Sequence, residues 1–390
     1  MVRPAHRLAD IQPFYVVELL KQAMALAHQG RDIISLGIGE PDFTAPPPVV
    51  RALKRAAQDG LSQYTPPFGL MALRKAIATD YANRYNITID PARVVVTTGA
   101  SGALLLATLA VVDPGSTVLM PDPCYPANRN FVVAAGGRPN LIPTTAAQRF
   151  QISAEDLRRH WRADTSGILV ASPSNPTGTS LTEAQMAALL EETRQRNGFA
   201  IVDEIYMGLH YDEPLRSALT LDDDVLVINS FSKYFHMTGW RLGWLIVPES
   251  LIPLVDRLAA SLAICAPSLA QHAALACFEP ESQAEFERRR LIFQERRDYL
   301  LPELERLGLT VPAKPDGAFY VYADLSNLGM DSDTFSQRLL HEAGVVAVPG
   351  RDFGPAMADH MLRLSYATEL PRLREAVTRI EDFLDKLPVR

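Results

Sequence analysis

The segment that indicates the fold most clearly is residues 225–247, which read VLVINSFSKYFHMTGWRLGWLIV. Two apolar runs, Val225–Ile228 and Leu242–Val247, lie on either side of a polar loop that contains Lys233. Short apolar runs rich in β-branched residues are typical of buried strands. The loop therefore places Lys233 at the C-terminal end of the first strand, which is the edge where open α/β sheets bind ligands.

Further runs of the same kind precede this segment, and helical patterns fill the intervals. These runs are Val94–Thr97, Val118–Met120, Ile168–Ala171 and Ala200–Val202. Two of the intervening helices begin with the capping patterns Ser153-x-x-Asp156 and Thr182-x-x-Gln185, in which a hydroxyl accepts hydrogen bonds from the first turn. The alternation of strands and helices predicts α/β architecture.

The pattern changes after about residue 280. A long charged helix (Glu285–Leu307) is followed by a β-rich run (Ala318–Tyr322), another helix, and strands around Val345–Val348 and Met361–Ser365. This order indicates a second, α+β domain. We predict a large domain over residues 46–280 and a discontinuous small domain, in which residues 1–45 form an arm that joins residues 281–390.

Composition limits the class of partner. The chain has 390 residues, of which 47% are hydrophobic and 21% charged, as in ordinary globular proteins. A net charge of −7 lacks the basic surface that nucleic-acid binding needs. No apolar stretch is long enough for a signal peptide or a membrane span, and the odd count of three cysteines without a CxxC pair fits a reducing compartment. We expect a cytoplasmic protein with small-molecule substrates and no nucleic-acid or membrane partner.

The residues around Lys233 match the needs of pyridoxal 5′-phosphate (PLP). This cofactor needs a lysine amine, a carboxylate at its pyridine nitrogen, donors for its phosphate and an anchor for the substrate carboxylate. Ser230, Ser232 and Arg241 flank the lysine and offer hydroxyls and a guanidinium, which are good phosphate donors. A lysine taken alone is usually a surface charge, but this setting favours a role in cofactor binding.

A second strand ends in a candidate partner for the pyridine nitrogen. The strand Ala200–Val202 is followed directly by Asp203, and Tyr206 lies a short step further along. An ionised aspartate would keep the nitrogen protonated, and the phenol could bind the phenolic oxygen of the ring. An aspartate at a strand end can also be a simple turn cap.

Two glycine-containing segments invite comparison with phosphate-binding loops. Residues 98–102 (TGASG) lie between a strand and an apolar helix that we expect to start near Ala103, and such a helix start binds phosphate readily. Residues 37–42 (GIGEPD) lack the third glycine of a dinucleotide fingerprint and lead into prolines, which excludes a Rossmann site. Because no histidine or cysteine pair has ligand spacing, we predict no metal site.

Seven motifs in the same order make the chain resemble the fold-type I, class I/II aminotransferases over nearly its whole length. They are residues 39–43 (GEPDF), 63–65 (QYT), 175–178 (NPTG), 203–206 (DEIY), 230–233 (SFSK), 238–241 (TGWR) and 363–367 (RLSYA). The resemblance implies an aspartate aminotransferase-like fold, with a large PLP-binding domain whose mostly parallel seven-stranded sheet lies between helices, and a smaller α+β domain. It also implies ping-pong transfer of an amino group from an L-amino acid to a 2-oxo acid, through an internal aldimine on Lys233.

The same resemblance assigns roles to individual residues. Lys233, Asp203 and Tyr206 would be the catalytic residues. The other cofactor contacts would be Ala100, Ser101, Tyr125, Asn175, Ser230, Ser232 and Arg241, with Tyr64 contributed by the neighbouring subunit of a homodimer. Gly39, Asn175 and Arg363 would bind the substrate, because a guanidinium can hold a carboxylate through two parallel hydrogen bonds.

Other chemistries stay compatible with these motifs. Fold-type I lyases, such as C–S lyases or aminocyclopropane-carboxylate synthases, use the same kind of site, and fold analogy alone chooses weakly between reactions. A PLP-binding regulatory module is a third reading, but no spare basic N-terminal segment offers a DNA-binding domain. The identity of the amino donor and of the 2-oxo acceptor stays open.

Overall fold

The computed structural model describes residues 2–387 and is built around one large sheet. The strands of this sheet are β2 (Val94–Thr97), β3 (Thr117–Asp122), β4 (Arg138–Pro143), β5 (Thr165–Ala171), β6 (Phe199–Asp203), β7 (Leu226–Ser230) and β8 (Gly243–Ile246). Its seven strands lie in the order β2-β8-β7-β6-β5-β3-β4. Only β8 runs antiparallel to its neighbours. The predicted mostly parallel seven-stranded sheet is therefore confirmed.

Strand β4 is the one strand of this sheet that the sequence pattern missed. It lies at the sheet edge, where it pairs only with β3. Its residues RPNLIP include two prolines, and only one position is fully buried. Edge strands tolerate proline and need no continuous apolar run, so the usual signal of a buried strand is absent here.

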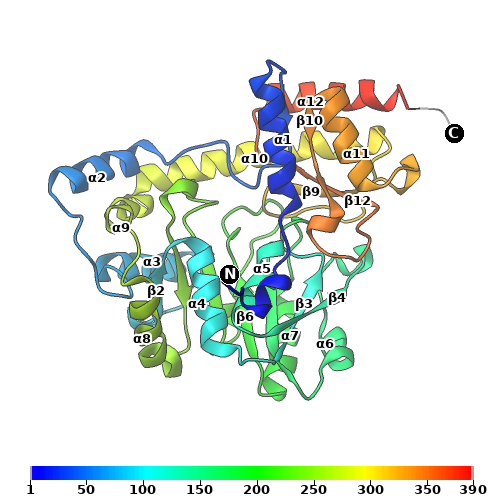
Figure 1. Ribbon diagram of the computed structural model, residues 1–390. Helices are drawn as coiled ribbons and strands as arrows, with labels where there is room; N and C mark the ends of the chain where they lie inside the picture. Colours follow the sequence, from blue (N-terminus) through cyan, green and yellow to red (C-terminus); the bar gives the residue numbers. More distant parts are fainter. Residues whose placement is uncertain (1, 388–390) are drawn as a thin grey trace.

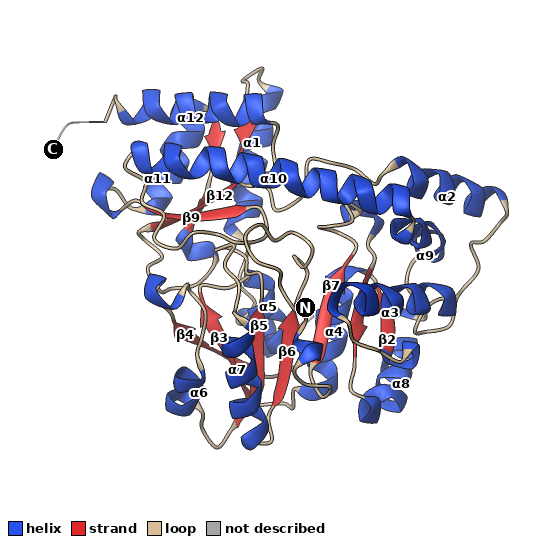
Figure 2. Cartoon of the chain, turned by 180° about the vertical axis from the view of Figure 1, so that it is seen from behind, coloured by secondary structure: helices blue, strands red, loops and turns tan. Residues whose placement is uncertain are grey.

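Helices cover both faces of the large sheet (Figure 2). They are α3 (Met71–Tyr85), α4 (Gly99–Val111), α5 (Pro126–Ala134), α6 (Ala154–His160), α7 (Glu183–Gln195) and α8 (Ile252–Ala263). Alternate strand residues face opposite cores. Val95 packs in one cluster with Leu104 of α4, whereas Val96 packs in the other with Leu189 of α7. Both predicted capping boxes, at the starts of α6 and α7, are confirmed.

A second, smaller group of strands lies at the other end of the molecule (Figure 1). Strands β9 (Tyr320–Asp324), β11 (Val348–Pro349) and β12 (Met361–Ser365) form an antiparallel sheet in the order β11-β12-β9, and β1 (Ile34–Ser35) pairs with β10 (Val345–Val346). Helices α1 (Tyr15–His28), α11 (Ser332–Arg338) and α12 (Leu370–Leu384) accompany them. Strand β9 begins two residues later than the run expected at 318–322, because Ala318 has a φ of 56°, which extended backbone does not adopt.

Helix α10 (Pro280–Arg306) connects the two groups of strands. It runs from α2 (Pro47–Gln58) and α9 (Ser268–Ala274) to α12 (Figures 1 and 2). It begins earlier than the expected Glu285, because Pro280 occupies the first helical position, which suits proline. Buried Arg296 donates to both carboxylate oxygens of Asp42 at 2.8 Å. Within residues 2–387, no helix is both long and apolar enough to cross a membrane.

Candidate active site

Three parallel, adjacent strands of the large sheet direct candidate residues to one edge. Asp203 is the last residue of β6, Lys233 lies in the loop after β7, and Asn175 lies in the loop after β5. In the sheet register Asp203 is opposite Ala171 of β5 and Ile228 of β7. The predicted position of Lys233 beyond a strand's C-terminal end is therefore confirmed as a matter of geometry.

Lys233 extends from this edge towards the arm of the chain. Its Nζ donates a hydrogen bond to the carbonyl oxygen of Gly39, and it lies 5.9 Å from the ring centroids of Tyr206 and Phe319. Burial lowers the pKa of the amine to about 8, although the charge of Glu40 opposes the shift. A lysine with such a pKa has a substantial neutral fraction near neutral pH, which nucleophilic and proton-transfer chemistry requires.

Asp203 is buried with few partners. Its Oδ1 accepts a hydrogen bond from the backbone N–H of Ile205 at 3.0 Å, so the carboxylate does cap the local turn. Burial raises the pKa of Asp203 to about 6, against the opposing effects of that hydrogen bond and of the Lys233 charge. A cationic partner would lower this pKa again.

The N-terminus of α4 and Arg241 form a second corner of the site. Helix α4 begins at Gly99, not near Ala103 as expected, because Gly99 adopts a φ of +68° that begins the helix early. Ala100 and Ser101 thus lie in its first turn, and no side chain caps the helix. A Cβ added to Gly99 would lie 2.5 Å from Nη2 of Arg241, so the guanidinium lies directly against this helix start.

Ser230 and Ser232 lie buried next to the same corner. The Ser230 hydroxyl is 3.0 Å from the Ser232 hydroxyl and 3.1 Å from the carbonyl oxygen of Leu242. Gly243 packs against the α4 start, since an added Cβ there would lie 2.8 Å from the backbone nitrogen of Ala100. Free helix N–H groups, hydroxyls and a guanidinium are the donors that phosphate prefers.

Arg363 extends from β12, in the small sheet, and is buried. Its Nη1 donates to Oδ1 of Asn175 at 2.9 Å, and its Nη2 donates to the carbonyl oxygen of Gly37 at 2.7 Å. Its Cζ lies 4.5 Å from the ring centroid of Tyr320 and 4.9 Å from that of Phe353. Its Nε has no hydrogen-bond partner among residues 2–387. The structure thus brings Arg363 and Asn175 together, and the guanidinium is held in one orientation.

Tyr206 and Tyr125 lie close enough to each other for the charge of Tyr125 to affect Tyr206. The Tyr206 hydroxyl is 2.9 Å from the hydroxyl of Tyr320. Tyr125 occupies the N-cap of α5, and its ring centroid lies 6.3 Å from that of Phe14. Burial is the main cause that raises the pKa of Tyr125, and the charge of Asp203 raises it further.

Tyr64 is the one predicted site residue that the single chain does not bring to the others. Its side chain is 80% exposed. The loop before α3 that carries it is attached by a hydrogen bond from the Ser268 hydroxyl to the carbonyl oxygen of Gln63 at 2.7 Å. Its assignment to a neighbouring subunit stays a prediction.

Several residues that contact the candidate site could not be identified from sequence patterns. Tyr320 and Phe353 stack on Arg363, and the Gly37 carbonyl accepts from it. Tyr320 falls within a run that predicts a strand, but no motif connects it with β12. Only the antiparallel pairing of β9 with β12, which aligns Tyr320 with Ser365, brings it under the guanidinium.

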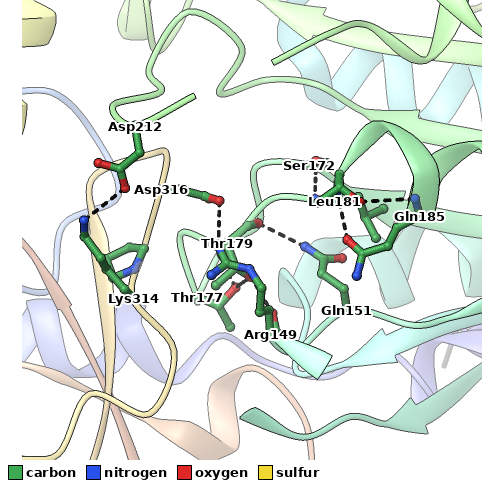
Figure 3. A network of polar contacts seen from close by, with 12 residues as sticks. Arg149, Gln151, Ser172, Thr177, Thr179, Leu181, Gln185, Asp212, Lys314 and Asp316 are labelled. Atoms are coloured by element: carbon green, nitrogen blue, oxygen red, sulfur yellow. Dashed lines mark hydrogen bonds and ion pairs between the residues drawn. The ribbon is translucent and has the colours of Figure 1, made fainter. Parts of the chain in front are cut away.

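A polar network fixes the loop that holds Asn175 (Figure 3). Gln151 donates to the carbonyl oxygen of Thr179 at 3.0 Å, and the Thr179 hydroxyl donates to the carbonyl oxygen of Arg149 at 2.6 Å. Arg149 forms an ion pair with Asp316 at 2.6 Å. The carbonyl oxygen of Gly178 accepts from the backbone N–H groups of both Asp316 and Gly317 at 2.9 Å.

Comparison with known proteins agrees with this geometry. The family model for aminotransferase class I and II matches residues 31–380. The chain belongs to the class I and II aminotransferases. This family depends on PLP, and the chain is therefore a PLP-dependent transaminase with the fold of the aspartate aminotransferases.

Several relatives are similar along nearly their whole length. Valine–pyruvate aminotransferase from Mycobacterium tuberculosis is 40% identical over 96% of this chain and 97% of its own. Aspartate aminotransferase from Thermotoga maritima is 36% identical over 98% and 99%. Among solved structures, an aminotransferase from Mycobacterium tuberculosis superimposes with a TM-score of 0.96 at 40% identity, covering 99% of this chain and 100% of its own. Aspartate aminotransferase from Thermus thermophilus with maleate gives 0.93 at 33% identity, covering 98% and 100%.

The polar and charged side chains of this transaminase suit three parts of PLP, namely its phosphate, its pyridine nitrogen and its aldehyde. The start of α4 lies against Arg241 and Gly243, and Ser230 pairs with Gly243 in the sheet register, an arrangement that suits a phosphate. The buried carboxylate of Asp203 has no charged hydrogen-bond partner in the described part of the chain, which suits a protonated pyridine nitrogen. The buried Lys233 amine donates to the carbonyl oxygen of Gly39 and has a lowered pKa, which suits attachment to an aldehyde.

Proposed function

We propose that this transaminase moves the amino group of an L-amino acid to a 2-oxo acid by a ping-pong mechanism, with PLP held covalently on Lys233. The observation that carries the proposal is that Asp203 of the large sheet and Arg363 of the small sheet both lie close enough to Lys233 for their charges to act on its amine. Such a constellation supplies an amine, an anion and a carboxylate clamp.

Each residue has a proposed task. When bound, PLP supplies an electron sink for the charge that develops at the substrate Cα. Lys233, once released by the incoming amine, carries the proton to and from that carbon as general acid and base. Asp203 keeps its negative charge against the pyridine nitrogen. Arg363 holds the substrate α-carboxylate, assisted by Asn175 and the backbone of Gly39.

The remaining residues hold the cofactor in place. Tyr206 and the amide nitrogen of Asn175 would bind the phenolic oxygen of the cofactor, and the Tyr125 ring would pack against the cofactor ring. The phosphate contacts are Ala100, Ser101, Ser230, Ser232 and Arg241, with Tyr64 from a second subunit. Arg363 and Asn175 would orient the substrate so that its Cα–H bond stands perpendicular to the ring, which favours proton removal at Cα over loss of the carboxylate.

Trapping the covalent link tests the proposal. PLP-loaded protein is reduced with borohydride and digested, and mass spectrometry should locate the label on Lys233. Lys233→Ala should lose both the visible absorbance and transamination, whereas Lys54→Ala, an exposed lysine of α2, should retain both. A label on another lysine would contradict the assignment.

A substrate panel tests the reaction itself. The panel pairs L-valine with pyruvate and L-aspartate with 2-oxoglutarate, and includes other neutral and aromatic donors. Formation of a new amino acid together with a new 2-oxo acid supports transamination. Release of ammonia or of a thiol without an amino-group acceptor would instead assign the site to a lyase.

We further propose a homodimer that shares its active sites. Tyr64 is a large, exposed aromatic on a proline-containing loop, which suits a contact across an interface. Inactive Lys233→Ala subunits are mixed with impaired Tyr64→Ala subunits under conditions that allow exchange. Hybrid dimers should regain activity above either parent, because one site in each hybrid contains both residues. Verified exchange without recovery would reject the shared site.

The same proposal covers the organisation of the chain and its location. We divide it into a large PLP-binding domain, residues 46–280, and a small domain formed by residues 1–45 and 281–390. The separation of the two groups of strands, bridged by α10, supports this division. The three free cysteines support a reducing compartment, as the cytoplasm provides.

A further inference from the structure

Tyr320 of β9 occupies the junction between the two halves of the candidate site. It lies on the same face of the small sheet as Arg363, since Ser365 is its partner in the register and Arg363 pairs with Tyr322 two residues along. The Tyr320 side chain is fully buried. The Arg363 guanidinium lies over its ring, with Cζ 4.5 Å from the centroid.

The Tyr320 hydroxyl contacts Tyr206, which follows strand β6 of the large sheet. It lies 2.9 Å from the hydroxyl of Tyr206, and the two rings meet edge to face at 85°. A phenol has one proton to donate. If the Tyr206 hydroxyl donates its hydrogen bond to another acceptor, then Tyr320 must be the donor in the hydrogen bond between the two hydroxyls. Burial raises the pKa of Tyr320 to about 12, so this proton is retained across the working pH range.

The same hydroxyl also lies close to the arm of the chain. A Cβ added to Gly39 would lie 3.0 Å from it, which is tighter than ordinary van der Waals contact. The carbonyl oxygen of Gly39 in turn accepts from the Lys233 amine. Tyr320 therefore has three neighbours in the candidate site. They are Tyr206, which we propose binds the cofactor, Arg363, which we propose binds the substrate carboxylate, and Gly39, whose carbonyl oxygen accepts from Lys233.

We propose that Tyr320 is a positioning residue of the transaminase, whose hydroxyl strengthens Tyr206 as a hydrogen-bond donor and whose ring holds Arg363 in the orientation that binds a carboxylate. The proposal rests on the proposed function, in which Tyr206 binds the phenolic oxygen of PLP and Arg363 binds the substrate. Chains of hydrogen bonds polarise one another, so a hydroxyl that accepts a hydrogen bond becomes a stronger hydrogen-bond donor itself. A cation over an aromatic face is attracted to it, and burial strengthens the attraction.

Two substitutions separate the hydroxyl from the ring. Tyr320→Phe removes only the hydroxyl. Without this hydroxyl, Tyr206 is a weaker hydrogen-bond donor to the phenolic oxygen of the cofactor, and the protonated form of the cofactor is favoured. The midpoint of the pH titration of visible absorbance in the PLP-loaded protein should therefore rise by about 0.5 pH unit or more. KM should change by less than about twofold, because the ring remains. Tyr320→Leu removes the ring as well, so KM for amino and oxo substrates alike should rise about five- to tenfold.

A double-mutant cycle tests whether the hydroxyl acts through Tyr206. In a Tyr206→Phe background, Tyr320→Phe should produce no further shift of the midpoint, because the pair is already broken. The control is Tyr322→Phe, on the same face of β9, whose hydroxyl has no partner in the described structure and should leave the midpoint unmoved. Circular dichroism and thermal melting verify that each variant folds.

The outcomes distinguish this proposal from the function on which it rests. If borohydride fails to label Lys233 in the unmodified protein, the proposed function fails and the role of Tyr320 fails with it. If Lys233 is labelled but Tyr320→Phe leaves the midpoint unchanged, or shifts it equally in the Tyr206→Phe background, only the role of Tyr320 is overturned.

Discussion

Asp203 and Arg363 are both buried charged residues of one candidate site, yet the protein holds them differently. The carboxylate of Asp203, at the end of the large sheet, accepts a hydrogen bond from the backbone N–H of Ile205, and burial raises its pKa to about 6. Arg363, in the small sheet, donates to Asn175 and Gly37 and lies between two aromatic rings. The carboxylate of Asp203 can therefore still pair with a bound cation. The guanidinium of Arg363, in contrast, is already held in one orientation by its neighbours.

The largest expected effect comes from Asp203→Asn. If Asp203 acts as a charge on the cofactor, kcat should fall about 100- to 1000-fold, as when an aligned electrostatic contact is removed, while KM changes little. The measurement is steady-state kinetics at saturating PLP. The matched control is Glu204→Gln, because burial raises the pKa of Glu204 to about 8 and the amide replaces a carboxyl that is already mostly neutral at pH 7. A variant that keeps full turnover with PLP bound would remove Asp203 from this role.

Arg363→Lys should have the opposite kinetic signature. An ammonium cannot reproduce the planar fork of donors, so KM should rise about 10- to 100-fold for every amino and oxo substrate, with a smaller effect on kcat. Arg351→Lys provides the control, since this half-exposed arginine forms an ion pair with Asp333 away from the clamp. Loss of one substrate alone would place Arg363 against substrate side chains instead.

The smallest expected effect concerns stability without cofactor. Because the folded pKa of Asp203 exceeds its ordinary value of 3.8, ionisation destabilises the folded protein progressively as pH rises from about 4 to about 6. Two pKa units correspond to at most ~3 kcal/mol, and the buried amide retains part of that penalty. Apo Asp203→Asn should therefore be about 1–2 kcal/mol more stable than the unmodified protein above pH 6.

Urea unfolding at pH 4 and pH 7.5 measures this difference. The gain should disappear at pH 4, where the unmodified carboxyl is mostly protonated in the folded protein. Saturating PLP should also reduce it at pH 7.5, because the bound cation compensates the charge. An equal gain at both pH values would show that packing, not ionisation, separates the two proteins, and the comparison with Arg363 would lose its basis.

The sequence predicted those parts of the molecule that depend on local patterns. Runs such as Val225–Ile228 identify buried strands, and the sheet edge beyond them locates Lys233 because parallel strands end together. It could not identify Tyr320, since its contact with Arg363 depends on the register between two strands far apart in the chain. The start of α4 was missed because a positive φ at Gly99 is not visible in a pattern of apolar residues.

The turn at Gly178 has a consequence for exchanging parts between related enzymes. Its carbonyl oxygen binds two N–H groups of the loop before β9, and a Cβ added to it would lie 2.6 Å from Pro315. A chimera of two related enzymes joined at residue 280 would therefore take the turn at Gly178 from one parent and the loop before β9 from the other, and the two would no longer match. Residue 280 is far from both segments in the sequence. Residues 172–181 and 314–320 thus depend on each other for their packing. If Arg363 is transferred to a related enzyme, both segments should be taken from the same parent.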